Sequence, residues 1–473
     1  MGQDSGTDAL LTEDRVAAWA EVAVAALAPH AGSVVVDESV GANLRWANSS
    51  LTTNGQTHDR TLTVVAHVAV PGGVAVGIAS GPLTGEADVD PLVARAVAAA
   101  ADSAPAEDAV DLVPGEVGEG WEQAAAAGGI EVFDAFAGAL GPHLRGAAEA
   151  GTAWFGFAEH VVTTTWLATT AGVRRRSVDR MGRVEINVKR PAGQALPPAS
   201  VWVGQSWAEP AELDVDALAA ELDRRLGWSE RSVELPAGRY EVLLPPSAVA
   251  DLMIYAYWTM SRRDAEEGRN VFAGEPGRSR IGERLATLPI TIASDPDAEG
   301  MEAPRHAVVR APEAGMVSVF DNGAPVGRVE WLREGVLEHL VTPRTPAGQE
   351  LCFPTDNLLV EAGGSTDLDA MVAGTRRGLL LTCLWYLREV DPETLLLTGL
   401  TRDGVYLVED GRVVAQVNNF RFNESPVSLL RRATEASVSE RTLCREWNDW
   451  FTRTRVPALR VPDFNMSTVS QAS

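Results

Sequence analysis

The sequence predicts an α+β protein in which two N-terminal α+β subdomains are followed by a mainly β C-terminal domain with a packed helix. Two patterns support this fold class. In the first half of the chain, segments with apolar residues at helical spacing alternate with segments rich in Thr, Val and Trp, and a helix-then-strands order occurs twice. In the second half, short apolar segments follow each other closely and tight-turn residues separate them. We expect domains at residues 1–110, 118–230 and 236–465.

The first unit is expected to contain, in chain order, a helix over 12–27, strands over 33–39, 44–55, 61–70 and 73–81, a helix over 90–103 and a linker over 103–120. Apolar residues recur at helical spacing in both helices, and Thr12 is a suitable N-cap for the first. Asn54-Gly55 and Gly72-Gly73 are turn dipeptides, so we expect them to separate the strands of a small antiparallel sheet. The linker is rich in Pro, Gly and acidic residues.

The second unit repeats this plan. Apolar spacing predicts a helix over 130–150, and the Thr, Val and Trp content of 152–190 predicts strands. A further helix is expected over 214–228, with Asp214 as its cap. The shared plan suggests that the two units are related, although no repeat is visible residue by residue.

The third unit opens with a short strand that ends at Pro245 and Pro246. Ser247 can then cap a helix, which we expect over 247–264. A second helix is expected near 368–380.

Strands dominate the remainder of the third unit up to about residue 423. The dipeptides Asp403-Gly404 and Asp410-Gly411 are each flanked by apolar segments. Because this is a strong short-range hairpin signal, two hairpin turns are predicted there.

Length and charge limit the function classes. A chain of 473 residues with 45% hydrophobic residues can bury more than one sizeable core. The 65 acidic residues exceed the 40 basic ones, which gives a formal net charge of -25. This charge repels phosphate backbones and anionic lipids, so neither nucleic acid nor a membrane is expected as a partner.

Cysteine usage and the N-terminal segment indicate a cytoplasmic protein. Cys352, Cys383 and Cys444 stand far apart and form no C-x-x-C pair, which argues against a disulfide framework and against a cysteine-rich zinc site. The first residues are polar and acidic, unlike a secretory signal, and no apolar segment is long enough to cross a bilayer.

The chain lacks the residues that several common kinds of active site require. The histidines are His30, His58, His67, His143, His160, His306 and His339. None of them is followed by glutamate, so no helical zinc motif is present. Lys189 is the only lysine, which argues against Schiff-base chemistry. The chain also has no phosphate-binding loop and no G-x-S-x-G elbow.

Two charged segments invite a functional interpretation. The arginine run 174–176 could bind an anion, but such a run more often forms a solvated strand face or turn. Asp295, Asp297 and Glu299 match the first half of a calcium loop, but His306 stands at the twelfth position, where a bidentate glutamate is needed. We therefore interpret the acidic segment as an exposed turn.

Short motifs follow one another in a fixed order along the chain. They are R-W-A-N-S-S-L-T-T-N at 45–54, G-x-Y-x-V-L-L-x-P at 238–246, G-R-x-x-F at 268–272, an Asp-Pro turn at 295–296, and the segments 320–325, 363–366, 386–391, 404–411 and 417–420. In order and spacing, these motifs resemble the TldD/TldE (PmbA) family over nearly the whole chain.

The resemblance implies a function. The family works as paired TldD and TldE subunits that form a cytoplasmic zinc protease, which trims unstructured peptides, including natural-product precursors. In TldD a helix carries H-E-x-x-x-H, which supplies two zinc-binding imidazoles and a glutamate that activates water. The matching positions here are Ile254, Tyr255 and Thr259, and the family's cysteine ligand falls near Arg402. The resemblance therefore implies a TldE-type subunit without catalytic or metal-binding residues, with zinc in its partner.

We accordingly expect a heterodimer with a TldD-like homologue that contains H-E-x-x-x-H, and an unstructured peptide as substrate. Tyr257 and Trp258 could line a cleft or an interface, or could pack in a core. Two alternatives remain open. One is a self-sufficient, non-metallo peptidase with Thr398 or Ser425 as nucleophile. The other is a homodimeric peptide-binding scaffold.

Overall fold

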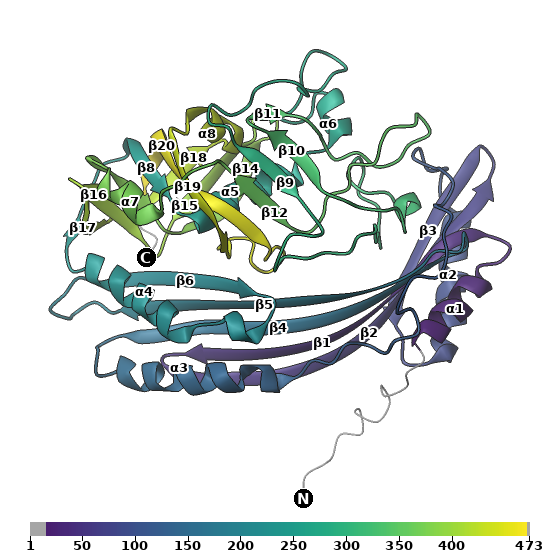
Figure 1. The fold of residues 1–473 in the computed structure, drawn as a ribbon, viewed down its shortest axis with the longest axis horizontal. Coiled ribbons are helices and arrows are strands. Elements are labelled where there is room, and N and C mark those ends of the chain that lie inside the picture. Colours follow the sequence, from purple (N-terminus) through teal and green to yellow (C-terminus); the bar gives the residue numbers. More distant parts are fainter. Residues whose placement is uncertain (1–15, 471–473) are drawn as a thin grey trace, which may run out of the picture.

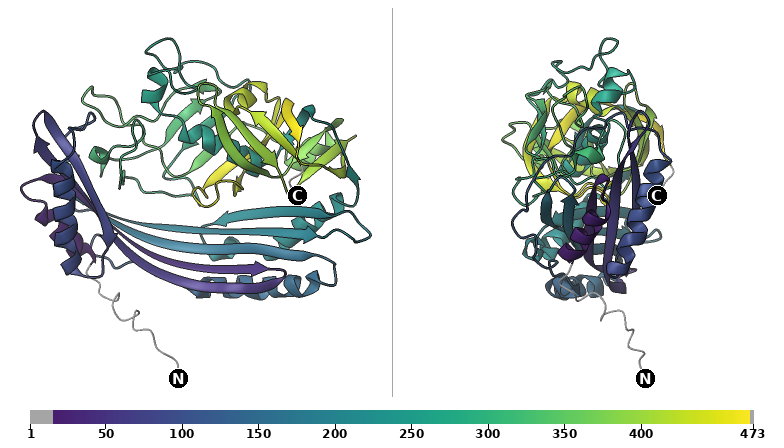
Figure 2. Two further views of the ribbon diagram at one scale, coloured as in Figure 1. Left: turned by 180° about the vertical axis from the view of Figure 1, so that it is seen from behind. Right: turned by 90° about the vertical axis from the view of Figure 1, so that its right-hand side faces the viewer.

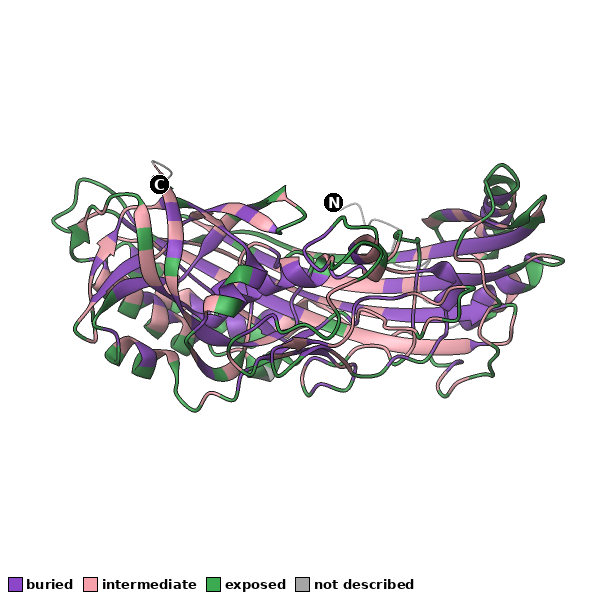
Figure 3. Cartoon of the chain, turned by 90° about the horizontal axis from the view of Figure 1, so that it is seen from above, coloured by how far each residue is buried: buried purple, intermediate pink, exposed green. Residues whose placement is uncertain are grey.

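The computed structural model describes residues 16–470, which form two layers. One layer is a long, curved six-stranded sheet from the N-terminal half of the chain, and the C-terminal domain lies on its concave side (Figure 1). The view from behind and the end-on view show the same arrangement (Figure 2). Seen from above, buried residues run along the strands of both layers (Figure 3).

The six-stranded sheet is antiparallel throughout and has the order β3-β2-β1-β4-β5-β6. Its strands are β1 Ala31–Ala47, β2 Ser50–Val70, β3 Gly73–Pro82, β4 Ala153–Thr169, β5 Arg174–Arg190 and β6 Ala199–Trp207. Ser33 lies opposite Thr169 and Trp46 opposite Gly156, so β1 and β4 pair over nearly their full length. The strands of both predicted units therefore share one sheet. The domain boundary near 103–120 stays a prediction.

The first hairpin turns earlier than the sequence predicts. Asn54 and Gly55 lie inside β2, where they pair with β1, and the turn is made by Asn48 and Ser49 with φ of 49° and 59°. The turn predicted at Asn54-Gly55 is therefore wrong, because β1 continues along β4 and keeps β2 paired beyond that dipeptide. The predicted turn at Gly72 is confirmed, with a φ of 97° that suits glycine.

The four helices predicted in the N-terminal half are present. They are α1 Val16–Ala26, α2 Val89–Ala101, α3 Asp134–Ala147 and α4 Val215–Trp228. Short 3₁₀ helices cover Glu86–Asp88, Ile130–Phe133, Pro210–Glu212 and Val319–Asp321. α1 and α2 share one apolar core with the sheet, and α3 and α4 share another at its far end. Asp214 caps α4 as predicted, since Oδ1 accepts the Ala217 N–H at 2.9 Å, whereas Thr12 lies outside the described residues.

The arginine run at the start of β5 holds other segments against the sheet. Arg174 pairs with a glutamate of α1 at 2.6 Å. The guanidinium groups of Arg175 and Arg176 donate to the carbonyl oxygens of Glu116 and Ala124 at 2.8 and 2.5 Å. A guanidinium carries five donors and can satisfy an irregular backbone. The run lies on a half-exposed part of β5, in agreement with a strand face, and its contacts hold α1 and the segment 116–124 against the sheet.

The mainly β character predicted for the C-terminal domain is confirmed by a 14-stranded sheet. Its strands are β7 Ser232–Val233, β8 Gly238–Leu244, β9 Thr291–Ser294, β10 Val329–Arg333, β11 Val336–Leu337, β12 Leu358–Glu361, β13 Arg377–Leu381, β14 Leu384–Asp391, β15 Leu396–Thr401, β16 Val405–Glu409, β17 Arg412–Val417, β18 Phe420–Glu424, β19 Glu435–Thr442 and β20 Thr454–Val469. Its helices are α5 Pro246–Trp258, α6 Arg262–Glu266, α7 Leu368–Ala373 and α8 Pro426–Arg432. Within residues 16–470, no helix has the length and apolar character needed to cross a membrane.

Two predicted helices of this domain are too long. The helix expected over 247–264 divides into α5 and α6, because the Ser261 hydroxyl accepts the Asp264 N–H at 3.2 Å and starts a new helix. The helix expected near 368–380 ends at Ala373, and its apolar second half is β13. That segment lies between β8 and β16, so sheet pairing overrides its helical periodicity.

One of the two predicted hairpins forms. Asp410 and Gly411, with φ of 46° and 77°, connect β16 to β17, and these two strands pair. The hairpin predicted at Asp403-Gly404 is wrong, because β15 pairs with β14 and β18 while β16 pairs with β13 and β17. The dipeptide permits a turn, but the partners of the flanking strands are chosen by the sheet as a whole.

Apolar and polar contacts both join the two layers near β1 and β2. Val65 of β2 packs with Phe320 of the C-terminal domain, and the ring of His67 lies 4.4 Å from that of Phe320. The Asn322 amide donates to the Ser33 hydroxyl at 2.8 Å. A titratable ring therefore lies in the apolar part of the contact.

Acid should weaken the contact between the layers. Burial lowers the pKa of His67 from 6.5 to about 4, against the opposing charge of Asp108. Since the unfolded chain takes up this proton near pH 6.5 and the folded chain only near pH 4, stability is lost as the pH falls through that window. We expect a smaller loss in His67→Gln, measured as the urea midpoint against pH.

His306 provides a second test of the same effect. Burial also lowers the pKa of His306 to about 4, so a double variant with His67→Gln and His306→Gln should lose still less stability in acid. Equal pH slopes for the parent protein and the double variant would contradict this expectation.

Candidate functional site

Two adjoining cavities lie between the concave face of the six-stranded sheet and the C-terminal domain. Their volumes are about 600 and 550 Å³. They share Phe155 and Lys189 from the sheet, and Arg402 and Asp403 from the loop between β15 and β16. We call the pair the interlayer cavity. Its larger part, the polar compartment, is rich in charged residues, and its smaller part, the apolar compartment, carries more apolar surface.

Strand alternation positions the sheet side of this cavity. In β5, Arg183, Glu185 and Lys189 line the cavity. Val184 and Ile186, which alternate with them, lie in the core beneath α3 and α4. Because successive side chains of a strand point to opposite faces, one face of β5 packs against helices and the other presents charges to the C-terminal domain.

The other side of the cavity is a strained loop. Asp403 has a φ of 50° and is 7% exposed, and Gly404 has a φ of 144°. A Cβ atom on Gly404 would lie 1.9 Å from the Thr382 hydroxyl oxygen. The Thr382 N–H donates to the Gly404 carbonyl at 2.9 Å, so the close approach of these two segments holds Arg402 and Asp403 at the cavity wall.

Arg445 also lines the polar compartment. Its guanidinium lies 4.1 Å from the ring centre of Trp385 and 5.3 Å from that of Trp202. It also donates to Glu185 at 2.8 Å. Two aromatic faces and one carboxylate therefore fix the position of this cation.

A buried acid and a buried thiol titrate far from their usual ranges. The carboxylate of Asp251 in α5 accepts the Glu446 N–H at 2.8 Å, and burial raises its pKa. Burial also raises the pKa of the Cys383 thiol, as does the charge of Asp403. Because burial disfavours the thiolate, Cys383 is poorly suited to act as a nucleophile or as a metal ligand.

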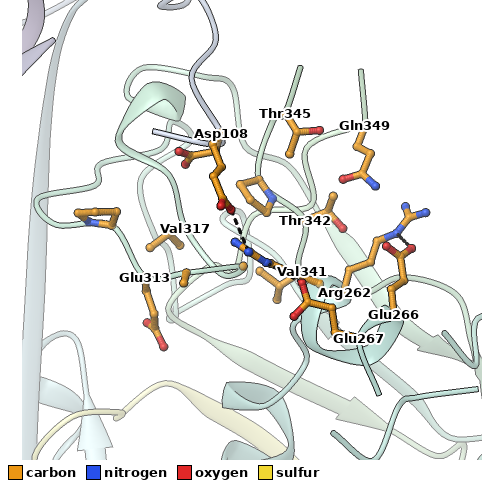
Figure 4. A pocket seen from close by; sticks show the side chains of 16 residues that line it. Asp108, Arg262, Glu266, Glu267, Glu313, Val317, Val341, Thr342, Thr345 and Gln349 are labelled. Atoms are coloured by element: carbon orange, nitrogen blue, oxygen red, sulfur yellow. Dashed lines mark hydrogen bonds and ion pairs between the residues drawn. The ribbon is translucent and has the colours of Figure 1, made fainter. Parts of the chain in front are cut away.

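A third cavity, of about 530 Å³, lies where the linker meets α6 (Figure 4). Arg263 pairs there with Glu107 of the linker at 2.9 Å and with Glu267 at 3.0 Å. Arg262 pairs with Glu266 at 2.7 Å. Neighbouring carboxylates pair with the arginines of this cavity, and the pair with Glu107 holds the linker against α6.

Comparison with known proteins gives the family. Residues 237–468 match the family described as the PmbA/TldA metallopeptidase C-terminal domain. The C-terminal domain of this chain belongs to the TldD/TldE (PmbA) family. No curated protein sequence gave a significant match.

Solved structures show the fold over almost the whole chain. TldE from Thermococcus kodakarensis has a TM-score of 0.74 at 15% identity, over 94% of this chain and 98% of that one. A Bacteroides thetaiotaomicron protein described as a candidate modulator of DNA gyrase has a TM-score of 0.72 at 12% identity, over 97% and 100%. A protein with a similar description from Thermotoga maritima has a TM-score of 0.66 at 15% identity, over 95% and 99%.

Of the four positions matched to the zinc motif and cysteine ligand of the TldD/TldE family, only one lies at the interlayer cavity. Ile254 is fully buried in the core of the C-terminal domain. The ring of Tyr255 packs 5.5 Å from that of Trp447, and Thr259 follows the end of α5. None of these three lines either compartment, whereas Arg402 lines both.

The two aromatic residues expected at a cleft or interface have different environments. Tyr257 is buried, its hydroxyl donates to the Thr355 carbonyl at 2.9 Å, and burial raises its pKa. Trp258 is partly exposed and packs edge-on against Trp447 and Phe451. Neither lines the interlayer cavity, so Tyr257 is a core residue and only Trp258 reaches the surface.

The residues at the cavity do not fit the zinc that the TldD/TldE family implies. Within residues 16–470, no group of three or more His, Cys, Asp or Glu side chains is arranged to hold a metal ion. The carboxylates of Glu185, Asp403 and Asp449 line the cavity, and each contacts an arginine. We therefore assign no zinc-dependent step to this chain.

The two candidate nucleophiles have structural hydrogen bonds. The Thr398 hydroxyl donates to the Phe422 carbonyl at 3.2 Å. The Ser425 hydroxyl donates to the Thr394 carbonyl at 2.7 Å and caps α8. In the described part of the chain, neither hydroxyl is hydrogen-bonded to a histidine or carboxylate that could activate it.

Sequence reasoning missed most of the cavity residues, although one signal was present. Positions 183–189 alternate charged or amide residues with Val184, Ile186 and Val188. Such alternation marks a strand with one buried face and one polar face. The alternation does not indicate that a second layer covers the polar face of β5, and this second layer makes that face a cavity wall.

The loop at Gly404 should tolerate no side chain. Gly404→Ala would place a Cβ atom against Thr382 in a backbone conformation that favours glycine, so we expect a loss of at least about 1 kcal/mol in the free energy of unfolding. Gly227→Ala is the matched control, because a Cβ atom there meets nothing within 4 Å. Urea unfolding of both variants tests this; equal stabilities would contradict the strain argument.

Proposed function

We propose that this chain is the non-catalytic, TldE-type subunit of a cytoplasmic, heterodimeric zinc peptidase. The observation that carries the proposal is the composition of the interlayer cavity. The six-stranded sheet and the TldD/TldE family domain together present arginine, lysine and aromatic side chains there. The one position matched to the zinc motif or cysteine ligand that reaches the cavity is Arg402. A guanidinium is always charged and cannot coordinate a dication or activate a bound water.

In this proposal the partner is a TldD-like homologue that contains H-E-x-x-x-H and supplies the zinc. The similarity in fold to TldE from Thermococcus kodakarensis supports the assignment to the TldE type. This chain would contribute a wall of the reaction chamber and hold an unstructured peptide, such as a natural-product precursor. Extended peptides bind through backbone hydrogen bonds and side-chain pockets, which strand edges and apolar slots can supply.

The segment 445–451 offers a surface for the partner. Trp450 is 68% exposed, and Trp447 beside it packs against Trp258 of α5. Tyr386 is also exposed, and its N–H donates to the Glu446 carboxylate at 2.9 Å. Exposed aromatic residues that cluster on an ordered segment are typical of protein interfaces.

Metal analysis and coexpression test the proposed subunit role. We expect the purified chain to contain no stoichiometric zinc and to cleave no peptide, and we expect it to copurify with the H-E-x-x-x-H homologue at low and high salt. An obligate interface of more than roughly 2,000 Å² and mainly apolar character should resist salt. A homologue that is fully active alone and elutes separately would favour the homodimeric scaffold, and activity of this chain alone would favour the self-sufficient peptidase.

A charge at position 450 should break the heterodimer. Trp450→Glu removes an exposed aromatic ring and places a carboxylate at the proposed interface, so we expect copurification to be lost while the thermal midpoint of the isolated chain is unchanged. Val117→Glu changes an equally exposed apolar residue in the linker and should leave the complex intact. Equal retention of the partner by both variants would place the interface elsewhere.

A further inference from the structure

The interlayer cavity concentrates positive charge inside an acidic protein. The chain carries a formal net charge of -25. Five basic residues nevertheless line the polar compartment, against three acidic ones. They are Arg45, Arg183, Lys189, Arg402 and Arg445, against Glu185, Asp403 and Asp449. Because the two layers restrict solvent around these charges, the cavity should attract a small anion that the outer surface repels.

Three of these cations are available to a ligand. Arg445 and Arg183 are engaged by cavity carboxylates at 2.8 and 2.5 Å. The Nε atom of Arg402 lies 3.6 Å from its nearest carboxylate, and this buried atom has no hydrogen-bond partner within the described residues. For Arg45 and Lys189, no carboxylate of residues 16–470 lies within ion-pairing distance.

Lys189 occupies a special position among the three. It is the only lysine of the chain, it is exposed, and with Arg402 it belongs to the wall that both compartments share. Its ammonium group lies 5.5 Å from the ring centre of Phe155. Beyond it, Pro191, Pro198 and other residues form the apolar compartment. A pair of cations therefore stands next to a slot for apolar side chains.

We propose that the interlayer cavity binds an extended peptide by one carboxylate, which Lys189 and Arg402 hold while neighbouring apolar side chains enter the apolar compartment. The peptide class rests on the proposed function, whereas the carboxylate is inferred from the cavity itself. A guanidinium and an ammonium group can together donate several charge-assisted hydrogen bonds to one carboxylate. A C-terminal carboxylate and an Asp or Glu side chain offer the same chemistry.

The unique lysine makes this binding directly measurable. An amine-reactive acetyl ester acylates Lys189 in the full-length chain, and peptide mass spectrometry measures the extent of acylation. The α-amino group of the chain is the internal control for the activity of the reagent. The probes are three unstructured peptides of one apolar sequence. The first has a free C-terminal carboxylate, the second a C-terminal amide, and the third an amide together with an internal glutamate.

We expect the free-acid peptide, at ten times its Kd, to slow acylation of Lys189 by about tenfold, because only unbound protein reacts. The neutral amide should give no protection. If the third peptide also protects Lys189, a side-chain carboxylate can occupy the site. If only the free-acid peptide protects it, the site binds the C-terminal carboxylate of a peptide. Equal protection by the acid and the neutral amide, or none by any peptide, would overturn the proposal.

Variants test the two anchors separately. Lys189→Met and Arg402→Gln should each raise the Kd of the fluorescently labelled free-acid peptide by about tenfold in anisotropy titrations, the effect of one charge-assisted hydrogen bond. Arg431→Gln, at an exposed arginine of α8 away from the cavity, is the matched control and should leave the Kd unchanged. Loss of binding in the control alone, or in none of the variants, would contradict the assignment.

Failure of the proposed carboxylate site can be distinguished from failure of the proposed subunit role. If the heterodimer forms and cleaves peptide but Lys189 is never protected, the carboxylate site is wrong and the subunit role stands. If Lys189 is protected by the acid but no complex forms, the carboxylate site stands and the subunit role fails.

Discussion

The pairing of β1 with β4 is the interaction on which the rest of this structure depends. Each N-terminal unit contributes only three strands and two helices. Joined from Ser33 to Trp46, they form one curved sheet with apolar cores under helices at both ends of a single face. Since side chains alternate between the faces of a sheet, the opposite, concave face is left for the C-terminal domain (Figure 1). The interlayer cavity is a consequence of this division.

The helix α5 packs in the core of the C-terminal domain and does not line the interlayer cavity. Ile254 and Tyr257 are buried, and the helix packs within the main core of the C-terminal domain. An imidazole or carboxylate at such a position would need hydrogen-bond partners that an apolar core does not offer. Asp251, the one charged residue of α5, is tied to the backbone of Glu446. The helix here has a packing role, and the polar groups that could meet a ligand lie on β5 and on the loop at Arg402.

That loop and β5 differ in how they are held. The charges of β5 are placed by a regular strand whose other face is fully packed, so their spacing is rigid. Arg402 and Asp403 depend on a glycine in an unusual conformation and on its contact with Thr382. Backbone strain of this kind persists only where the surrounding structure enforces it, and it is often found at functional sites.

The sequence by itself determined the features that depend on neighbouring residues. Helical spacing and the cap at Asp214 gave α1 to α4, the Asp410-Gly411 dipeptide gave a hairpin, and dense apolar segments gave a mainly β C-terminal domain. The tertiary structure alone decided which distant strands pair. Asn54-Gly55 and Asp403-Gly404 carry the same local signal as Asp410-Gly411, yet long-range pairing of β1 and β15 places them inside a strand and at a cavity wall. A dipeptide limits the backbone conformations that are possible, but the pairing of the assembled sheets determines which conformation occurs. For this reason the cavity around Lys189 could not be predicted from local sequence.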